Sequence, residues 1–177
     1  MTFDNFEIDG MLERMVVLID TREQDTPTFR RRVQDMGCPV ERVKLDYGDY
    51  TCRTTLPDGR SYSLADKLVI ERKMSLDELC ACFGKGRARF TREFDRAKAD
   101  GARIVLLVEN GDWGKAYAGQ YRSLYRPASL VASLLCWMER YGMTPQFCPA
   151  HLSGRFIYGL LRYSLRERLE RGLPDEG

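Results

Sequence analysis

The sequence lacks the features of a zinc-binding or disulfide-rich protein. It contains one histidine, His151, and six scattered cysteines with no Cys-x-x-Cys pair. Structural zinc sites usually need four Cys or His ligands in paired spacing, so we predict no zinc site. Free thiols are typical of a reducing compartment, and we therefore expect a cytoplasmic protein.

Long apolar segments and nucleotide-binding motifs are also absent. The first residues include Asp4, Glu7 and Asp9 where a secretory signal would be apolar, and no apolar run is long enough for a membrane span. There is no P-loop and no G-x-G-x-x-G after a strand. We therefore expect no membrane association, and nothing favours an α/β protein that binds a small phosphorylated ligand.

Charge is balanced overall but uneven along the chain. The net charge is only +2, yet residues 85–98 hold six basic and two acidic side chains, and residues 155–171 hold five arginines and two glutamates. Local basic faces can neutralise phosphates even on a nearly neutral protein. The alternative is two solvated helix faces with intrahelical ion pairs.

Apolar patterning predicts one α/β domain with a mixed central sheet over the whole chain of 177 residues. We expect its core at about 15–150, a C-terminal helix at 155–171, a long-tipped hairpin at 50–73, and loose ends in the first dozen residues and at 172–177. The expected strands cover residues 15–19, 48–52, 67–71, 104–108 and 144–148, with a loosely strand-like stretch at 40–45. The other expected helices cover residues 26–36, 75–82, 87–99 and 127–141.

Carboxylates gather where the expected strands meet. Glu71 and Lys73 are two residues apart on one strand, so their side chains project from the same face. Asp49 lies on the partner strand of the expected hairpin, and Asp20 ends the first buried strand. Two or more carboxylates can hold Mg²⁺, and a nearby lysine can orient the attacking water. This inventory suits the hydrolysis of phosphodiester bonds.

The same residues lie in a longer motif. Gly48-Asp49 followed by Glu71-Arg72-Lys73 and Asp77 resembles the G-D … E-R-K-x-x-x-D motif of the XPF-type nuclease domain, in the PD-(D/E)XK nuclease superfamily. Residues 19–23 are similar to that family's D-x-R-E element, and residues 86–96 to its arginine-bearing helix. The resemblance covers about 15–150 and implies a restriction-endonuclease-like three-layer α/β fold, a mixed central sheet flanked by helices.

The resemblance also implies a role for each matched residue. Asp49 and Glu71 would be the metal carboxylates, the Arg72 backbone carbonyl a further ligand, and Lys73 a neighbour of the attacking water. Asp20 and Asp77 would be auxiliary acids near the metal, with Asp20 a possible ligand. Arg22, Glu23 and Arg72 would be supporting or phosphate-contacting groups, and the other expected DNA-binding residues are Lys85, Arg87, Arg89 and Arg92.

Several of these residues have a structural alternative. Asp20 could be a turn acid that closes a strand, and Asp77 lies in a first helical turn, where the helix dipole favours an acid. Arg72 points away from the Glu71 face and could form a structural ion pair. Glu109 could support the site or simply end a strand, so we leave it out of the catalytic set.

Four aromatic residues follow the fourth expected strand and are not part of the motif. Aromatic side chains can stack on unpaired bases, but more often they pack a loop onto the core, which is what we expect here. The residues are Trp113, Tyr117, Tyr121 and Tyr125.

The family acts on branched or flapped DNA. The resemblance therefore implies an endonuclease that uses Mg²⁺, with Mn²⁺ as a substitute, in DNA repair or recombination. It would be nucleoid-associated in a bacterium or phage and nuclear in a eukaryote. About 27 residues follow Ala150, so we expect no helix-hairpin-helix module. A homodimer or a partner protein could then supply extra DNA binding, and the last helix could serve dimerisation, DNA or the covering of the sheet.

Two alternatives keep the fold and change the activity. The chain could be a non-catalytic DNA-binding subunit, or another PD-(D/E)XK nuclease such as a resolvase. Intact Asp49, Glu71 and Lys73 argue against a subunit that only binds, because clustered carboxylates weaken DNA binding unless a cation lies between them. The Glu-Arg-Lys triplet favours the XPF type over a resolvase.

Overall fold

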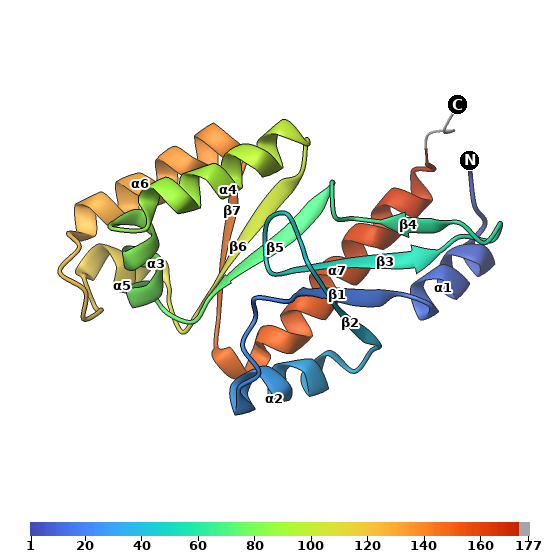
Figure 1. Ribbon diagram of the computed structural model, residues 1–177, viewed down its shortest axis with the longest axis horizontal. Helices are drawn as coiled ribbons and strands as arrows, with labels where there is room; N and C mark the ends of the chain where they lie inside the picture. Colours follow the sequence, from blue (N-terminus) through green and yellow to red (C-terminus); the bar gives the residue numbers. More distant parts are fainter. Residues whose placement is uncertain (174–177) are drawn as a thin grey trace.

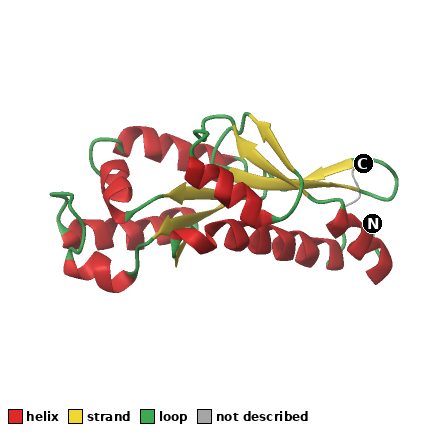
Figure 2. Ribbon diagram, turned by 90° about the horizontal axis from the view of Figure 1, so that it is seen from below, coloured by secondary structure: helices red, strands yellow, loops and turns green. Residues whose placement is uncertain are grey.

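A seven-stranded mixed sheet runs between two layers of helices (Figures 1 and 2). The computed structural model describes residues 1–173. The strand order is β2-β1-β3-β5-β6-β7, with β4 paired to β3, and it confirms the expected three-layer α/β fold. The β1–β3, β3–β4 and β3–β5 pairs are antiparallel and the other pairs are parallel. The strands are β1 (Val16–Asp20), β2 (Val40–Val43), β3 (Tyr50–Thr55), β4 (Ser61–Ser63), β5 (Leu68–Lys73), β6 (Arg103–Glu109) and β7 (Thr144–Cys148).

Each face of the sheet has its own hydrophobic core. Helices α1, α2 and α7 pack on one face, and α3, α4 and α6 pack on the other, with α5 beside α6 (Figure 1). A short 3₁₀ helix, η1 (Ala150–Leu152), precedes α7. The helices are α1 (Asn5–Glu13), α2 (Pro27–Met36), α3 (Leu76–Phe83), α4 (Arg87–Ala99), α5 (Trp113–Ala118), α6 (Pro127–Tyr141) and α7 (Ser153–Glu170).

Strand β5 contributes to both cores, because successive side chains of a strand point to opposite faces. Val69 belongs to the core under α4, and Ile70 belongs to the core under α7. The alternation continues to the end of the strand. It directs Glu71 and Lys73 towards the α4 layer and Arg72 towards the α2 layer.

Capping residues set several helix ends where the sequence predicted them. Thr26 accepts a hydrogen bond from the Phe29 backbone N–H (3.1 Å), Pro27 begins α2, and Gly37 ends it in the left-handed conformation (φ 63°). Helices α4 and α6 have their predicted bounds. Ser75 caps α3, because its hydroxyl accepts a hydrogen bond from the Glu78 N–H. The Glu78 carboxylate in turn accepts a hydrogen bond from the Met74 N–H.

The prediction of a loose N-terminus is wrong. Helix α1 begins with a capping box in which the Asp4 carboxylate accepts from the Glu7 N–H (2.8 Å) and Glu7 accepts from the Asp4 N–H (3.0 Å). Ile8 and Met11 are buried, and α1 packs against α7. At the other end the Leu173 N–H donates to the Met1 carbonyl, and the rest of the predicted loose end, 174–177, lies outside the described residues.

The predicted hairpin at 50–73 is more elaborate than expected. Strand β4 lies inside its tip and pairs with β3, while the β3–β5 ladder is limited to the pairing of Tyr50 with Ile70. Helix α5 was also not predicted. Among the described residues no helix combines the length and the apolar character needed to span a membrane.

Candidate active site

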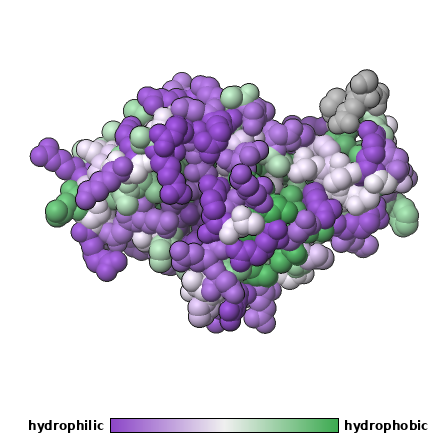
Figure 3. All heavy atoms as spheres, viewed as in Figure 1, coloured by the Kyte–Doolittle hydropathy of each residue, from purple (hydrophilic) through white to green (hydrophobic). Residues whose placement is uncertain are grey.

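A cleft of about 790 Å³ opens where the carboxyl end of β5 meets the loop between β2 and β3. Its lining includes Asp49 from that loop, Glu71 and Lys73 from β5, and Arg22 and Glu23 from the turn after β1. In the view of Figure 3, hydrophilic side chains cover much of the centre of the molecule, next to a smaller apolar patch. The structure therefore brings together the central residues of the motif.

Backbone contacts hold Asp49 in place. Its N–H donates to the Ile70 carbonyl (2.8 Å), its carbonyl accepts from the Asp20 N–H (2.9 Å), and its Oδ2 accepts from the Arg72 N–H (2.7 Å). The preceding Gly48 has a φ of +70°, and a Cβ there would lie 2.8 Å from the Val69 Cβ. Gly48 is thus required for the backbone conformation of this turn, and Asp49 supplies the carboxylate.

Glu71 and Lys73 lie side by side in a buried environment. The Glu71 residue is 4% exposed and Lys73 is 8% exposed, and the Lys73 Nζ donates to the Glu71 Oε1. The lysine also lies over the Phe90 ring, 5.1 Å from its centroid. The second carboxylate oxygen, Glu71 Oε2, is buried without a hydrogen-bond partner among the described residues. A buried carboxylate oxygen in this state is the kind of group that a cation stabilises.

Burial and neighbouring negative charges disfavour the ionised forms of both carboxylates. Burial raises the pKa of Asp49 to about 7, and although Lys73 opposes this effect, the charges of Glu23 and Glu93 add to it. Burial and the charge of Asp49 raise the pKa of Glu71 well above its ordinary value. Burial lowers the pKa of Lys73, but the neighbouring charges of Glu71 and Asp49 outweigh it and hold the pKa above its ordinary value. The site thus concentrates negative charge that one lysine only partly offsets.

The donor set fits a hard divalent cation. In a strand, the N–H and C=O of one residue face the same edge, so the Arg72 carbonyl faces the Asp49 side, as its N–H does. Within residues 1–173 no group of three or more His, Cys, Asp or Glu side chains is placed to hold a metal. A cation here would therefore take Asp49, Glu71 and that carbonyl, with water or phosphate oxygens filling the remaining positions, as Mg²⁺ prefers.

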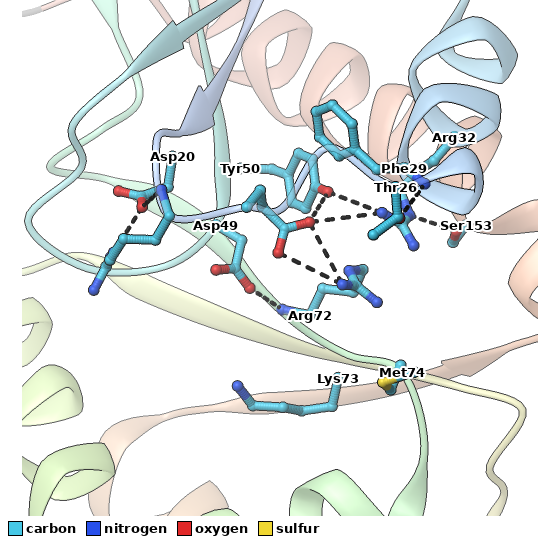
Figure 4. Close-up of polar contacts among 12 residues, drawn as sticks. Asp20, Thr26, Phe29, Arg32, Asp49, Tyr50, Arg72, Lys73, Met74 and Ser153 are labelled. Atoms are coloured by element: carbon cyan, nitrogen blue, oxygen red, sulfur yellow. Dashed lines mark hydrogen bonds and ion pairs between the residues drawn. The ribbon is translucent and has the colours of Figure 1, made fainter.

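A second charged network lies on the opposite face of β5. Arg72 donates to Glu109 (3.2 Å) and pairs with Glu23 (3.5 Å), Arg32 pairs with the same Glu109 (3.0 Å), and the Tyr50 hydroxyl donates to Glu23 (2.6 Å). Figure 4 shows the Arg72 and Lys73 side chains leaving β5 in opposite directions. The Arg72 side chain therefore forms structural ion pairs, which was the alternative to a direct role at the site. Arg32 and Tyr50 were missed because their partners are distant in the sequence.

Asp20 is placed outside the cleft lining. It is fully buried, its Oδ1 accepts from the Arg22 backbone N–H (2.7 Å) and Nε (2.6 Å), and its Oδ2 accepts from the Leu45 N–H (2.7 Å). Burial opposes ionisation, but these hydrogen bonds hold the pKa of Asp20 below its ordinary value. Both oxygens thus accept hydrogen bonds that position Arg22 and the loop at Leu45.

Asp77 is also absent from the cleft lining. Its Oδ1 accepts from the backbone N–H groups of Arg122 (2.8 Å) and Ser123 (2.7 Å), and its Oδ2 lies 3.5 Å from the Arg122 Nε. The expected auxiliary acid therefore ties the loop between α5 and α6 to α3. The position of Asp77 in a first helical turn did not predict that its carboxylate binds this loop.

The expected basic residues separate into different environments. Arg22 and Arg89 line the cleft, and Lys85 lines an adjoining pocket together with Arg89. Arg87 turns the other way and donates to a serine hydroxyl on α6 (3.2 Å). Arg92 is exposed and lies outside both linings. The strongest candidates for phosphate contacts are thus Arg22, Arg89 and Lys85.

Two acids of the site were not predicted. Glu93 on α4 is 7% exposed and accepts from the Gly48 N–H (2.9 Å), and Glu78 on α3 lies 4.0 Å from the Lys73 Nζ. In the sequence, Glu93 is one of two acids within a basic segment. Its spacing from Phe90 and Ala97, three and four residues away, places it on the buried side of α4 and could have indicated its position.

Most of the aromatic residues after β6 pack onto the core, as expected. Trp113 contacts Phe147 (ring centroids 5.6 Å apart), and Tyr121 and Tyr125 pack against the core under α4. Tyr117 is the exception, because it is 63% exposed.

A mixed sheet whose cleft carries an acidic pair beside a buried lysine defines a nuclease-like α/β domain. The chain belongs to the ERCC4 domain family, whose model matches residues 19–160. A comparison with curated proteins found no match.

Among the solved structures that share the fold, two are similar over most of this chain. The first, XPF from Aeropyrum pernix, is 22% identical with a TM-score of 0.60, over 84% of this chain and 66% of that one. The second, XPF from Aeropyrum pernix in complex with DNA, is 24% identical with a TM-score of 0.60, over 88% of this chain and 68% of that one. The chain therefore spans about two thirds of the length of these proteins.

Proposed function

We propose that the chain is a Mg²⁺-dependent endonuclease that hydrolyses phosphodiester bonds in branched or flapped DNA, with Mn²⁺ as a substitute metal. The observation that carries the proposal is the buried, unpartnered Oε2 of Glu71 beside Asp49 and Lys73. A protein that only binds DNA gains nothing from placing such a pair in a cleft, because uncompensated carboxylates repel the phosphate backbone.

Each residue of the cleft has a distinct task in this proposal. Asp49 and Glu71 hold the cation together with the Arg72 carbonyl. When bound, the cation supplies polarisation of the phosphate and acidification of a water molecule. Lys73 orients that water and offsets the charge that develops on the phosphate. Arg22 and Arg89 line the same cleft and bind the flanking phosphates.

The choice of DNA rests on family membership and on the arginines of the cleft. The matched family is the ERCC4 domain, and one solved relative of the same fold is described as a complex with DNA. The preference for branched or flapped DNA, the role in repair or recombination, and the need for a homodimer or partner protein are carried over from the XPF-type resemblance. A nucleoid-associated or nuclear location would follow from that role.

Cleavage of a panel of labelled DNA substrates tests the proposal. Fork, flap, nicked, four-way-junction and linear duplex DNA would be incubated with the protein in Mg²⁺, Mn²⁺ or EDTA, beside Asp49→Ala and Lys73→Ala. The proposal predicts metal-dependent cutting of the branched substrates that both substitutions abolish. Binding without cutting in every metal would instead identify a non-catalytic DNA-binding subunit, and cutting only of four-way junctions would identify a resolvase.

A further inference from the structure

Helix α4 presents one buried acid to the cleft. Glu93 is 7% exposed, and Phe90 and Phe94 beside it belong to the core under α4. Its contacts are a hydrogen bond from the Gly48 N–H (2.9 Å) and a wider ion pair with the Arg22 Nη2 (3.9 Å). Burying a carboxylate costs free energy, and a half-exposed arginine at that distance offsets only part of the cost.

The group that Glu93 holds is the peptide next to a proposed metal ligand. Gly48 directly precedes Asp49, and no side chain fits at Gly48 because a Cβ would meet Val69. Asp49 is anchored to β1 and β5 through its own backbone and carboxylate. The Glu93 bond anchors the same turn to α4, so Asp49 is held from both sides of the cleft.

Glu93 also acts on the site through its charge. Its carboxylate lines the same cleft as Asp49 and Glu71 and accepts a hydrogen bond from the residue that directly precedes Asp49. It therefore places a third negative charge in the cleft of both proposed ligands. A divalent cation between the ligands would gain from this third negative charge even without direct contact.

We propose that Glu93 is a positioning residue for the divalent cation: it fixes the Gly48–Asp49 turn by a hydrogen bond and strengthens the cation site by its charge. This inference rests on the proposed function, since it requires that Asp49 and Glu71 hold a metal. Hydrogen-bonded supporting groups of metal ligands typically contribute about 10- to 100-fold to metal affinity.

Mn²⁺ binding to the full chain without DNA, followed by the EPR signal of free Mn²⁺, separates the two contributions. Glu93→Gln keeps an oxygen that can accept from Gly48 and removes the charge, whereas Glu93→Ala removes both. We expect about 10-fold weaker binding for Glu93→Gln and a larger loss for Glu93→Ala. Asp95→Asn is the matched control, because Asp95 is an exposed acid on the same helix whose hydrogen bond is to Tyr141, and it should bind Mn²⁺ as the wild type does.

The dependence of cleavage on Mn²⁺ distinguishes positioning from damage to the fold. The cleavage rate of Glu93→Gln should return to within a few-fold of wild type at saturating Mn²⁺, whereas that of Asp49→Ala should not. Wild-type Mn²⁺ affinity in both Glu93 variants would overturn the inference while leaving the proposed function intact. A wild-type protein that binds no Mn²⁺ would overturn the proposed function itself.

Discussion

The carboxylate of Asp49 accepts a hydrogen bond from the backbone N–H of Arg72, with 2.7 Å between its Oδ2 and the nitrogen. The Arg72 side chain points the other way, to Glu109 and Glu23. One residue thus orients a proposed metal ligand with its backbone and joins β5 to a buried charge network with its side chain. The two roles can be separated by substitution.

Arg72→Ala should destabilise the protein while leaving the cation site largely intact. It leaves the buried Glu109 and the partly buried Glu23 with fewer partners, and breaking a buried pair costs about 3–5 kcal/mol of unfolding free energy. The backbone N–H that Asp49 uses remains. Urea unfolding would measure the first effect and Mn²⁺ binding at low temperature the second. Lost Mn²⁺ binding with unchanged stability would contradict these assignments.

Without a metal, stability should fall as the pH rises towards neutrality. The pKa of Asp49 is about 7 in the folded protein and about 3.9 in an unfolded chain, so the folded state binds more protons between these values. The resulting loss of stability is absent at pH values below the pKa of the unfolded chain. It is complete at pH values above the pKa of the folded protein. In EDTA, Asp49→Asn should therefore melt several degrees above the wild type at pH 8 and near it at pH 4. Equal melting temperatures at pH 8 would contradict the raised pKa.

Asp20→Asn should weaken the fold more than it weakens metal binding. The Asp20 carboxylate accepts from Arg22 and Leu45 and does not line the cleft. Each hydrogen bond to a charged group contributes about 1.5–3 kcal/mol to the free energy of unfolding. Because the folded-state pKa is lowered, this contribution is present above the unfolded pKa and is lost as the pH falls. Mn²⁺ affinity within about two-fold of wild type is the expected result, and abolished binding in a folded variant would show that Asp20 is a metal ligand.

Asp77→Ala should loosen a loop and leave the chemical step in place. Its carboxylate holds the N–H groups of Arg122 and Ser123, away from the cleft. Limited trypsin digestion should cut faster after Arg122 in the variant. The single-turnover rate at saturating DNA should stay within a few-fold of wild type. A loss as deep as that of Asp49→Ala would show that Asp77 acts at the metal.

Local signals in the sequence predicted much of the fold. The bounds of α2, α4 and α6 agree with their apolar periodicity and flanking glycines, and β5 has the alternation that places Glu71 and Lys73 on one face. Helix α5 escaped prediction because a helix of six residues depends on tertiary packing more than on its own pattern. Helix α1 escaped it although Asp4 and Glu7 have the spacing of a capping box.

The limits of the site prediction follow from sequence distance. The central motif residues Asp49, Glu71 and Lys73 meet because β5 carries the last two and Asp49 directly precedes β3, the neighbour of β5 in the sheet. Glu93 joins them through Gly48, 45 residues away, and Arg32 reaches Glu109 across 77 residues. No periodicity encodes such contacts. Asp20 and Asp77 fit the motif equally well, but nearby backbone N–H groups occupy their carboxylates.

The most direct test is single-turnover cleavage of an end-labelled DNA fork by the wild type and by Glu71→Gln in Mg²⁺. The substitution keeps the shape of the side chain and removes the negative charge that we propose binds the cation. Circular dichroism would verify that the variant is folded. The account predicts Mg²⁺-dependent cutting by the wild type and a loss of at least about 100-fold in the variant, since metal stabilisation of several kcal/mol depends on that charge. Cutting by Glu71→Gln at the wild-type rate would contradict it.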